Sequence, residues 1–391
     1  MPLGDSAAPG QTLATQVIGT VADVARGLVA PSWTLGRQKL FISSGKGASA
    51  GPGQGISLRV ATQNVWCHYL ATPTRQLFER RGSGERSGVA DDRVNGLRYW
   101  KRLDLLARHL ASVADVVVVQ ELFMLRLGPI VISHNVRRFV ALMEDLGFPY
   151  QSDPNATLPS WAGQNCGVMI FSRFPMVACH AEAFRRTDEI PSSKGFVDVV
   201  IEIPAINSGE TGMRVRVLGT HFDARSWPAK LSQLWQVADR LSAERLEFTR
   251  SECRPWEVAA VGRHTPTIVC GDFNICPQLA GAGGYDDGTA FSTLRGALLA
   301  AGLVHAWSAS PSRGDASDAA DVGAEPTADD EAFPLTEGRA TLDHVWISQP
   351  SGNGLRLIAR DVVAVFESPG HLLASDHLGL VVTVSIGDNA H

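Results

Sequence analysis

The sequence predicts a layered α/β domain in which helices cover the outer faces of β-sheets. From Leu58 onward, segments rich in β-branched residues alternate with segments in which apolar residues recur every three or four positions. This alternation is typical of sheets packed against helices. Hydrophobic residues make up 45% of the 391 residues and charged residues 19%, which allows a sizeable core and excludes a largely disordered chain.

Strand-like segments account for most of this domain. Strands are expected at Leu58–Val65, Asp115–Gln120, Gly167–Ser172, Val197–Ile203, Arg214–Thr220, Thr267–Cys270, Leu342–Ile347 and Leu380–Val384. Helices are expected around Leu103–Leu110 and Leu231–Leu241, where apolar residues fall on one helical face.

The chain divides into one large domain, residues 56–388, and an N-terminal appendage, residues 1–55. Apolar residues at helical spacing between Leu13 and Leu28 predict an amphipathic helix in the appendage, followed by a glycine-rich linker that ends at Gly55. The polar face of this helix has few Lys and Arg residues, which favours packing or disorder over membrane contact. Residues 311–340 form a predicted solvated loop, in which Asp315–Glu331 holds seven acidic residues and no basic ones.

Charge and composition exclude several classes of protein. The formal net charge of −5 argues against a polybasic nucleic-acid-binding protein and against attachment to an anionic membrane by charge alone. No segment approaches the roughly 18 apolar residues of a membrane-spanning helix. The six cysteines form no CxxC pair, and the N-terminus lacks the features of a signal peptide. We expect a soluble protein that is cytoplasmic or peripheral to a membrane; secretion is compatible with the sequence, and the oligomeric state is left open.

Polar side chains gather where the predicted strands begin or end. These junctions are Gln63-Asn64, Gln120-Glu121, Thr220–Asp223, Gly271–Asn274, Thr341–His344 and Ser375–His377. A turn or a helix cap explains any one of them, but six in one chain point to the ligand crevice that lies at strand ends in layered α/β folds.

The residue types at these junctions favour metal-assisted hydrolysis of a phosphate ester. The chain has no Walker, HExxH or GxGxxG motif. It offers carboxylate and amide oxygens, which suit Mg²⁺ or, as an alternative, Mn²⁺. A metal neutralises phosphoryl oxygens while a histidine held by an aspartate takes a proton from water.

The ordered series QNVW, VVVVQE, THFDA, CGDFN, TLDHVW and ASDH resembles the endonuclease/exonuclease/phosphatase superfamily. The resemblance spans about Leu58 to Val384 and implies a four-layer αββα sandwich (DNase I-like) with metal-dependent phosphoester hydrolysis. Asn165–Val168 followed by Ser172–Pro175, the SKGF segment Ser193–Phe196, and Thr220–Ala224 are similar to the neutral sphingomyelinase branch. The inositol-phosphatase signature segments are absent.

This resemblance implies a role for each junction residue. Glu121 is implied as the principal Mg²⁺ ligand, with Asn64 beside the metal or the phosphate and Asp376 against the metal or its waters. His377 is implied as the general base and Asp343 as the carboxylate that orients it. Asp272 is implied to orient the attacking water or to assist at the metal, and the sequence leaves open whether Asp272 or His377 activates the water.

The remaining implied roles concern the phosphate. His221 and Asn274 are expected to donate hydrogen bonds to phosphoryl oxygens in the transition state, and Asn165 and Lys194 are expected to contact the phosphate. His344 departs from the family pattern, which commonly has Tyr at this position, so its role is left open between a polar strand residue and a support for the site.

The implied substrate is a phospholipid at a membrane surface, with sphingomyelin hydrolysed to ceramide and phosphocholine. Trp161, Trp227 and the aromatic residues from Tyr285 to Phe291 are candidates for membrane contact, although ordinary packing explains each of them. A nuclease of the same superfamily is the alternative, because basic residues are frequent between Arg75 and Arg102. An inactive binding protein with this fold is a further alternative.

Overall fold

The computed structural model describes residues 56–67, 99–189, 192–204, 212–242, 265–277, 287–308, 341–348, 355–363, 374–375 and 377–386. The predicted appendage at residues 1–55 and the predicted acidic loop at residues 311–340 lie outside this part of the chain.

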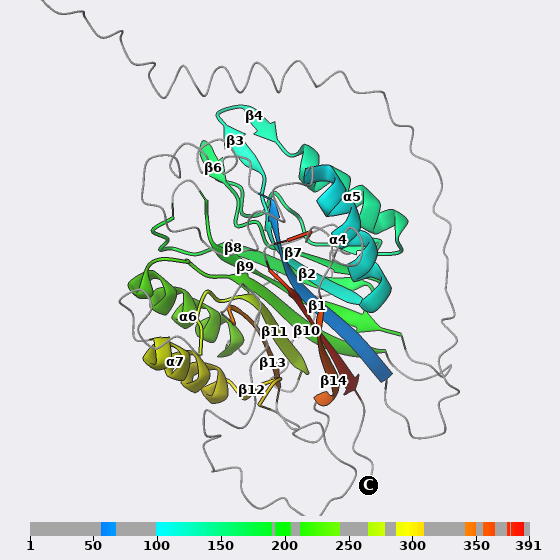
Figure 1. Ribbon diagram of the computed structural model, residues 1–391, viewed down its shortest axis with the longest axis vertical. Coiled ribbons are helices and arrows are strands. Elements are labelled where there is room, and N and C mark those ends of the chain that lie inside the picture. Colours follow the sequence, from blue (N-terminus) through cyan, green and yellow to red (C-terminus); the bar gives the residue numbers. More distant parts are fainter. Residues whose placement is uncertain are drawn as a thin grey trace, which may run out of the picture. The chain divides into compact units, whose positions relative to one another are not determined.

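The first six-stranded sheet has the order β14-β15-β1-β2-β7-β5. Its strands are β1 (Ile56–Cys67), β2 (Val116–Leu122), β5 (Tyr150–Gln151), β7 (Met169–Ser172), β14 (Leu355–Val363) and β15 (Gly379–Ile386). The central strand β1 is parallel to β2, with Val60 opposite Val116, and antiparallel to β15. The carboxyl ends of β1 and β2 therefore lie side by side (Figure 1).

The second six-stranded sheet has the order β12-β13-β11-β10-β9-β8. Its strands are β8 (Met176–Ala183), β9 (Gly195–Ile203), β10 (Met213–His221), β11 (Thr267–Asp272), β12 (Leu303–His305) and β13 (Asp343–Ser348). Here β10 is parallel to β11, with Leu218 opposite Val269. This second parallel pair brings a further two carboxyl strand ends together.

The two sheets pack face to face, and helices cover their outer faces. Side chains such as Val60, Val118, Val199 and Val217 form the apolar layer between the sheets. Leu106 packs on the outer side of the first sheet. The helices α4 (Tyr99–Val113) and α5 (His134–Asp145) cover the first sheet, and α6 (Trp227–Ser242) and α7 (Asp287–Ala300) cover the second. This arrangement confirms the predicted four-layer αββα sandwich (Figure 1).

All eight predicted strands are present, whereas two longer strands were not predicted. β14 and β8 are edge strands of the first and second sheets, respectively. Edge strands have fewer neighbours to pack against, so their sequences carry a weaker burial pattern. The two predicted helices are α4 and α6, and the sequence analysis did not predict α5 or α7.

A small third sheet, of order β4-β3-β6, follows directly after β2. Its strands are β3 (Leu125–Leu127), β4 (Ile130–Ile132) and β6 (Ala162–Gln164).

None of the helices in the described ranges combines the length and apolar character needed to cross a membrane.

Candidate active site

The parallel strand pairs bring side chains of both sheets to one end of the sandwich. Asn64, near the carboxyl end of β1, lies opposite Gln120, the residue before Glu121. In the other sheet, Asp272 is paired with His221 on one side and Asp343 on the other. The two groups meet across the sandwich, because Asn64 Nδ2 donates a hydrogen bond of 3.0 Å to Asp272 Oδ2.

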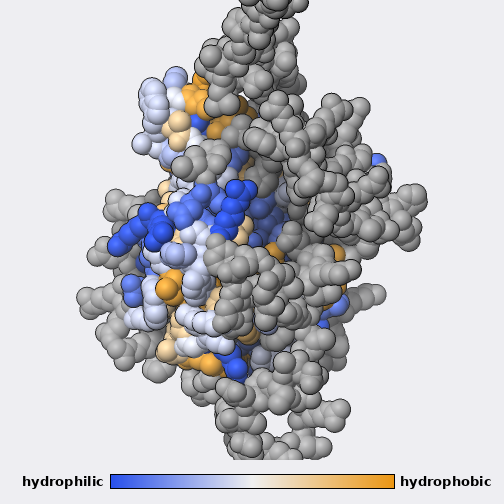
Figure 2. Space-filling view, turned by 60° about the vertical axis from the view of Figure 1, so that its left-hand side comes forward, coloured by the Kyte–Doolittle hydropathy of each residue, from blue (hydrophilic) through white to orange (hydrophobic). Residues whose placement is uncertain are grey.

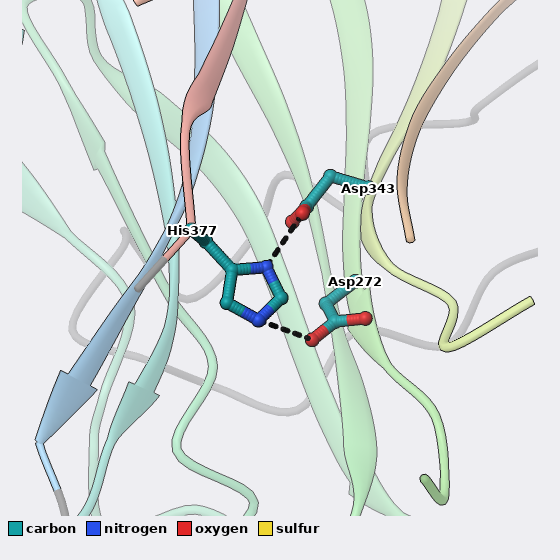
Figure 3. A group of neighbouring side chains, drawn as sticks. All are labelled: Asp272, Asp343 and His377. Carbon is teal, nitrogen blue, oxygen red and sulfur yellow. Dashed lines mark hydrogen bonds and ion pairs between the residues drawn. The ribbon is translucent and has the colours of Figure 1, made fainter. Parts of the chain in front are cut away.

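His377 and Asp343 form a buried hydrogen-bonded pair in this cluster (Figure 3). His377 Nδ1 lies 2.7 Å from Asp343 Oδ2, and His377 Nε2 lies 3.9 Å from Asp272 Oδ2. The His377 backbone is fixed as well, since Gln63 Nε2 donates to its carbonyl oxygen at 3.0 Å. A carboxylate on Nδ1 fixes the tautomer of the imidazole, so Nε2 is the atom presented for proton transfer.

Asp272 lies at the centre of the cluster and has an unusual pKa. Its Oδ2 lies 3.6 Å from His221 Nε2, in addition to its contacts with Asn64 and His377. Burial first, and the nearby Asp343 carboxylate second, raise the pKa of Asp272 to about 7. A buried carboxylate in such surroundings is stabilised in its charged form when a cation lies beside it.

A buried lysine brings positive charge into the site. Lys194 Nζ lies 2.8 Å from His221 Nε2 and 3.0 Å from Glu189 Oε2. Glu189 also accepts a hydrogen bond from the Ala224 backbone N–H. Glu189 was not predicted, because it lies outside every junction and is recognisable only by its spatial contact with Lys194.

The backbone of the site adopts conformations that most residues avoid. Within the described ranges, the non-glycine residues with positive φ are Trp66 (46°), Glu121 (60°) and Asn274 (50°). Glu121 and Asn274 belong to strand-end junctions and Trp66 follows one two residues later, and such strain is typical of functional sites. Gly271 precedes Asp272 at φ 146°, and a Cβ atom there would lie 2.0 Å from the Thr220 carbonyl oxygen. Only glycine fits this close approach of β11 to β10.

The two asparagines predicted to act on the phosphate have different surroundings. Asn274 lies beside the cluster, where its backbone N–H donates to Asp272 Oδ1 and its Nδ2 donates to the Phe222 carbonyl oxygen. Asn165 is buried and binds backbone at both ends of its amide: Oδ1 accepts from the Met124 N–H, and Nδ2 donates to the Pro154 carbonyl oxygen. Asn165 therefore connects two loops in this structure, and its contact with phosphate stays a prediction.

His344, whose role the sequence left open, supports the loop that carries Asp272 and Asn274. Its Nε2 lies 2.7 Å from the Ile275 carbonyl oxygen, and its Nδ1 lies 3.1 Å from His305 Nε2. Since the carbonyl requires a donor, His344 Nε2 carries the proton and Nδ1 accepts from His305. Burial lowers the pKa of His344 to about 4, so this imidazole is neutral near pH 7.

The donor set fits a hard divalent cation. Glu121 Oε1 lies 3.8 Å from His221 Nε2, and Asn64 and Asp272 contact each other directly. Carboxylate and amide oxygens in one buried group are ligands that Mg²⁺ and Mn²⁺ prefer. Asp272, Asp343 and His377 also converge closely enough to hold a metal ion. The 2.7 Å bond between His377 and Asp343 instead favours an acid–base pair at that position.

The described residues do not include the predicted metal ligand Asp376 or most of the basic stretch between Arg75 and Arg102. Arg102, the last member of the basic stretch, is buried and donates to the carbonyl oxygens of Ala374 and Trp66. Arg102 therefore supports the site from inside and is unsuited to bind DNA phosphates at the surface.

A model of the Endonuclease/Exonuclease/phosphatase family matches residues 61–377. The chain belongs to this family, whose members hydrolyse phosphoester bonds, and the resemblance seen in the sequence is thereby confirmed. A search of curated proteins finds no match.

Several solved structures are similar to this chain. An endonuclease/exonuclease/phosphatase from Beutenbergia cavernae DSM 12333 has 18% identity over 85% of this chain and 72% of its own, with a TM-score of 0.49. Sphingomyelinase C from Streptomyces griseocarneus has 18% identity over 84% and 99%, with a TM-score of 0.46. Beta toxin from Staphylococcus aureus, a mutant with bound magnesium ions, has 14% identity over 85% and 100%, with a TM-score of 0.47.

Proposed function

We propose that this chain is a Mg²⁺-dependent phosphodiesterase that hydrolyses sphingomyelin to ceramide and phosphocholine. The observation that carries the proposal is the buried His377–Asp343 pair, whose Nε2 faces Asp272 in a cluster completed by Asn64, His221 and Glu121. This arrangement combines a general base, hydrogen-bond donors and oxygen ligands within one buried cluster.

In the proposed mechanism, His377 Nε2 takes a proton from water as the water oxygen attacks phosphorus in line with the leaving ceramide oxygen. Asp343 holds the imidazole and stabilises its protonated form. Asp272 orients the attacking water or assists on the metal side, as the sequence analysis left open. Glu121 and Asn64, with Asp376, would hold Mg²⁺, which would supply neutralisation of the charge on the phosphoryl oxygens when bound.

Donors on the second sheet complete the proposed site. Lys194 and His221 contact each other at 2.8 Å, and Asn274 lies on the loop after Asp272. Lys194 and Asn274 carry donors suited to the negative charge that shifts onto phosphoryl oxygens in the transition state, and His221, whose Nε2 accepts from Lys194 Nζ, is proposed to donate once phosphate replaces that contact. A single donor of this kind typically contributes about 3–4 kcal/mol to transition-state stabilisation.

The choline-lipid substrate rests on the similarity of three features to neutral sphingomyelinases: Asn165–Val168 followed by Ser172–Pro175, Ser193–Phe196, and Thr220–Ala224. The last two segments place Lys194 against His221 in the site. Because the two segments meet in space, they act as one unit in the proposed recognition of the phosphate.

A substrate panel tests the proposal. Purified protein with Mg²⁺ is incubated separately with sphingomyelin vesicles and with supercoiled plasmid DNA, with and without EDTA. The expected result is phosphocholine release that EDTA abolishes, with little nicking of DNA. Strong nicking without phosphocholine release would refute the sphingomyelinase assignment and favour a nuclease of the same family.

A further inference from the structure

The small sheet β3–β4–β6 presents the most exposed large apolar side chain in the described part of the protein. Trp161, directly before β6, is 73% exposed, and Ile130, the first residue of β4, is 49% exposed. Figure 2 shows apolar residues at the top of the described surface, at the height of this sheet in Figure 1. We name Ile130, Trp161 and the turn Gly128–Pro129 between β3 and β4 the hairpin tip.

The hairpin tip holds its tryptophan in place. The Gly128 N–H donates to the Trp161 carbonyl oxygen at 2.8 Å, and the Trp161 ring lies over Gly128, about 3.7 Å from the position of a Cβ atom. Gly128 has φ 59°, a conformation that favours glycine. The exposed indole is therefore fixed on a tight turn, which reduces the conformational entropy lost when a partner covers it.

The charge around the hairpin tip is suited to phosphate groups. Residues 122–143, which contain β3, β4 and most of α5, include no acidic residue. The same segment contains Arg126, Arg137 and Arg138, although Arg138 pairs with Asp104. Residues 154–164, which lead into and through β6, also lack acidic residues. Tryptophan beside arginine in an acid-poor surface matches the interface of a phospholipid bilayer, where the indole sits at headgroup depth.

The inner end of this sheet is attached to the candidate active site. Strand β3 begins at Leu125, four residues after Glu121, and Leu125 pairs with Gln164 of β6. Gln164 accepts a hydrogen bond from Ser192 Oγ at 2.6 Å, and Ser192 lies two residues before Lys194. Strand geometry of about 3.3 Å per residue places the turn roughly 10 Å from Leu125. The tip thus projects from the segments that carry Glu121 and Lys194.

We propose that the hairpin tip docks this protein on a phospholipid bilayer, with Trp161 and Ile130 inserted among the headgroups. This inference rests on the proposed function, since a lipid phosphodiesterase must hold its site at the membrane surface. It names a surface for that contact and leaves the chemistry of the site unchanged.

The test compares the double variant Trp161→Ser/Ile130→Ser with Trp235→Ser, a control in which a 53% exposed tryptophan of α6 is replaced in the same way. Binding to sphingomyelin–phosphatidylcholine vesicles is measured by co-sedimentation in the presence of Mg²⁺. Turnover is measured on those vesicles and on a monomeric soluble phosphodiester, bis-p-nitrophenyl phosphate. Thermal unfolding verifies that the variants fold, and Trp161→Phe serves as the conservative variant.

We expect the double variant to lose vesicle affinity by about tenfold or more, because the apolar side chains of Trp161 and Ile130 are no longer present to be buried in the bilayer. Its turnover of the soluble substrate stays at the wild-type level, Trp235→Ser behaves as wild type on both substrates, and Trp161→Phe retains most of the affinity. Unchanged vesicle binding by the double variant overturns the proposal, as does wild-type protein that fails to sediment with vesicles. If wild-type protein binds vesicles through the hairpin tip but releases no phosphocholine, the docking surface stands and the proposed substrate fails.

Discussion

Replacing His344 by Phe tests whether the buried imidazole pair, His344 and His305, holds the loop that follows β11. Phenylalanine keeps a ring between Phe273 and Phe291, whose centroids lie 5.7 and 5.5 Å from that of His344. It removes the hydrogen bonds to the Ile275 carbonyl oxygen and to His305 Nε2. Each buried polar group that loses its partner costs about 1–3 kcal/mol, so the free energy of unfolding falls by roughly 2–6 kcal/mol at pH 7.5.

The pH dependence of this loss follows from the pKa of His344. Its pKa is about 4 in the folded protein against 6.5 in the unfolded chain, so protonation favours the unfolded state. The stabilisation is complete above pH 6.5 and is lost as the pH falls from 6.5 to about 4. This loss amounts to about 3 kcal/mol in the wild type and is missing in the variant. The difference in stability between the two proteins therefore shrinks over this range.

Urea unfolding at several pH values measures both effects, and turnover at pH 7.5 shows whether the loop has moved. We expect about a 10- to 100-fold loss of turnover, because the loop after Asp272 loses an anchor. His180→Phe is the matched control, since His180 is only partly buried and pairs with the half-exposed Glu182. A His344→Phe protein within 1 kcal/mol of wild type, or a stability difference independent of pH, would refute this reasoning.

Three further substitutions probe the fold and the site. Asp198→Ala leaves the buried Arg216 and neighbouring Arg240 without their shared carboxylate. We expect the free energy of unfolding, measured with urea, to fall by about 3–5 kcal/mol. Asp104→Ala, the control at an exposed pair with Arg138, lowers it by less than about 1 kcal/mol. Glu121→Gln removes a ligand charge and weakens Mg²⁺ binding by about tenfold or more in calorimetric titration, and an unchanged affinity contradicts its role as a ligand. Asp343→Asn lowers turnover about 10³- to 10⁴-fold with little change in Mg²⁺ affinity, because the amide no longer stabilises the protonated imidazole of His377. Turnover near the wild-type level would contradict the proposed His377–Asp343 pair.

The sequence predicted the interior strands and the junctions because both depend on local patterns. Runs such as Val116–Val119 are buried on both faces and are recognisable without any partner. Once β1 pairs with β2 and β10 with β11, the junction residues meet without further information.

Other features depend on contacts between segments distant in the chain and were not predicted. Glu189 is identified by its 3.0 Å contact with Lys194. Arg102 is identified by its hydrogen bonds to the carbonyl oxygens of Trp66 and Ala374. His344 and His305 are 39 residues apart and meet only when β12 pairs with β13. Their spacing in the sequence carries no periodic signal that would reveal this pairing.

In the proposed mechanism, His377 activates water for phosphodiester hydrolysis beside a Mg²⁺ site. The most direct measurement is phosphocholine release from sphingomyelin vesicles by wild type and His377→Ala at saturating Mg²⁺, with Mg²⁺ affinity measured on both proteins. We predict that the variant keeps its fold and binds Mg²⁺ with similar affinity, while turnover falls about 10²- to 10⁴-fold. Turnover by His377→Ala equal to that of wild type would contradict the assignment of the base.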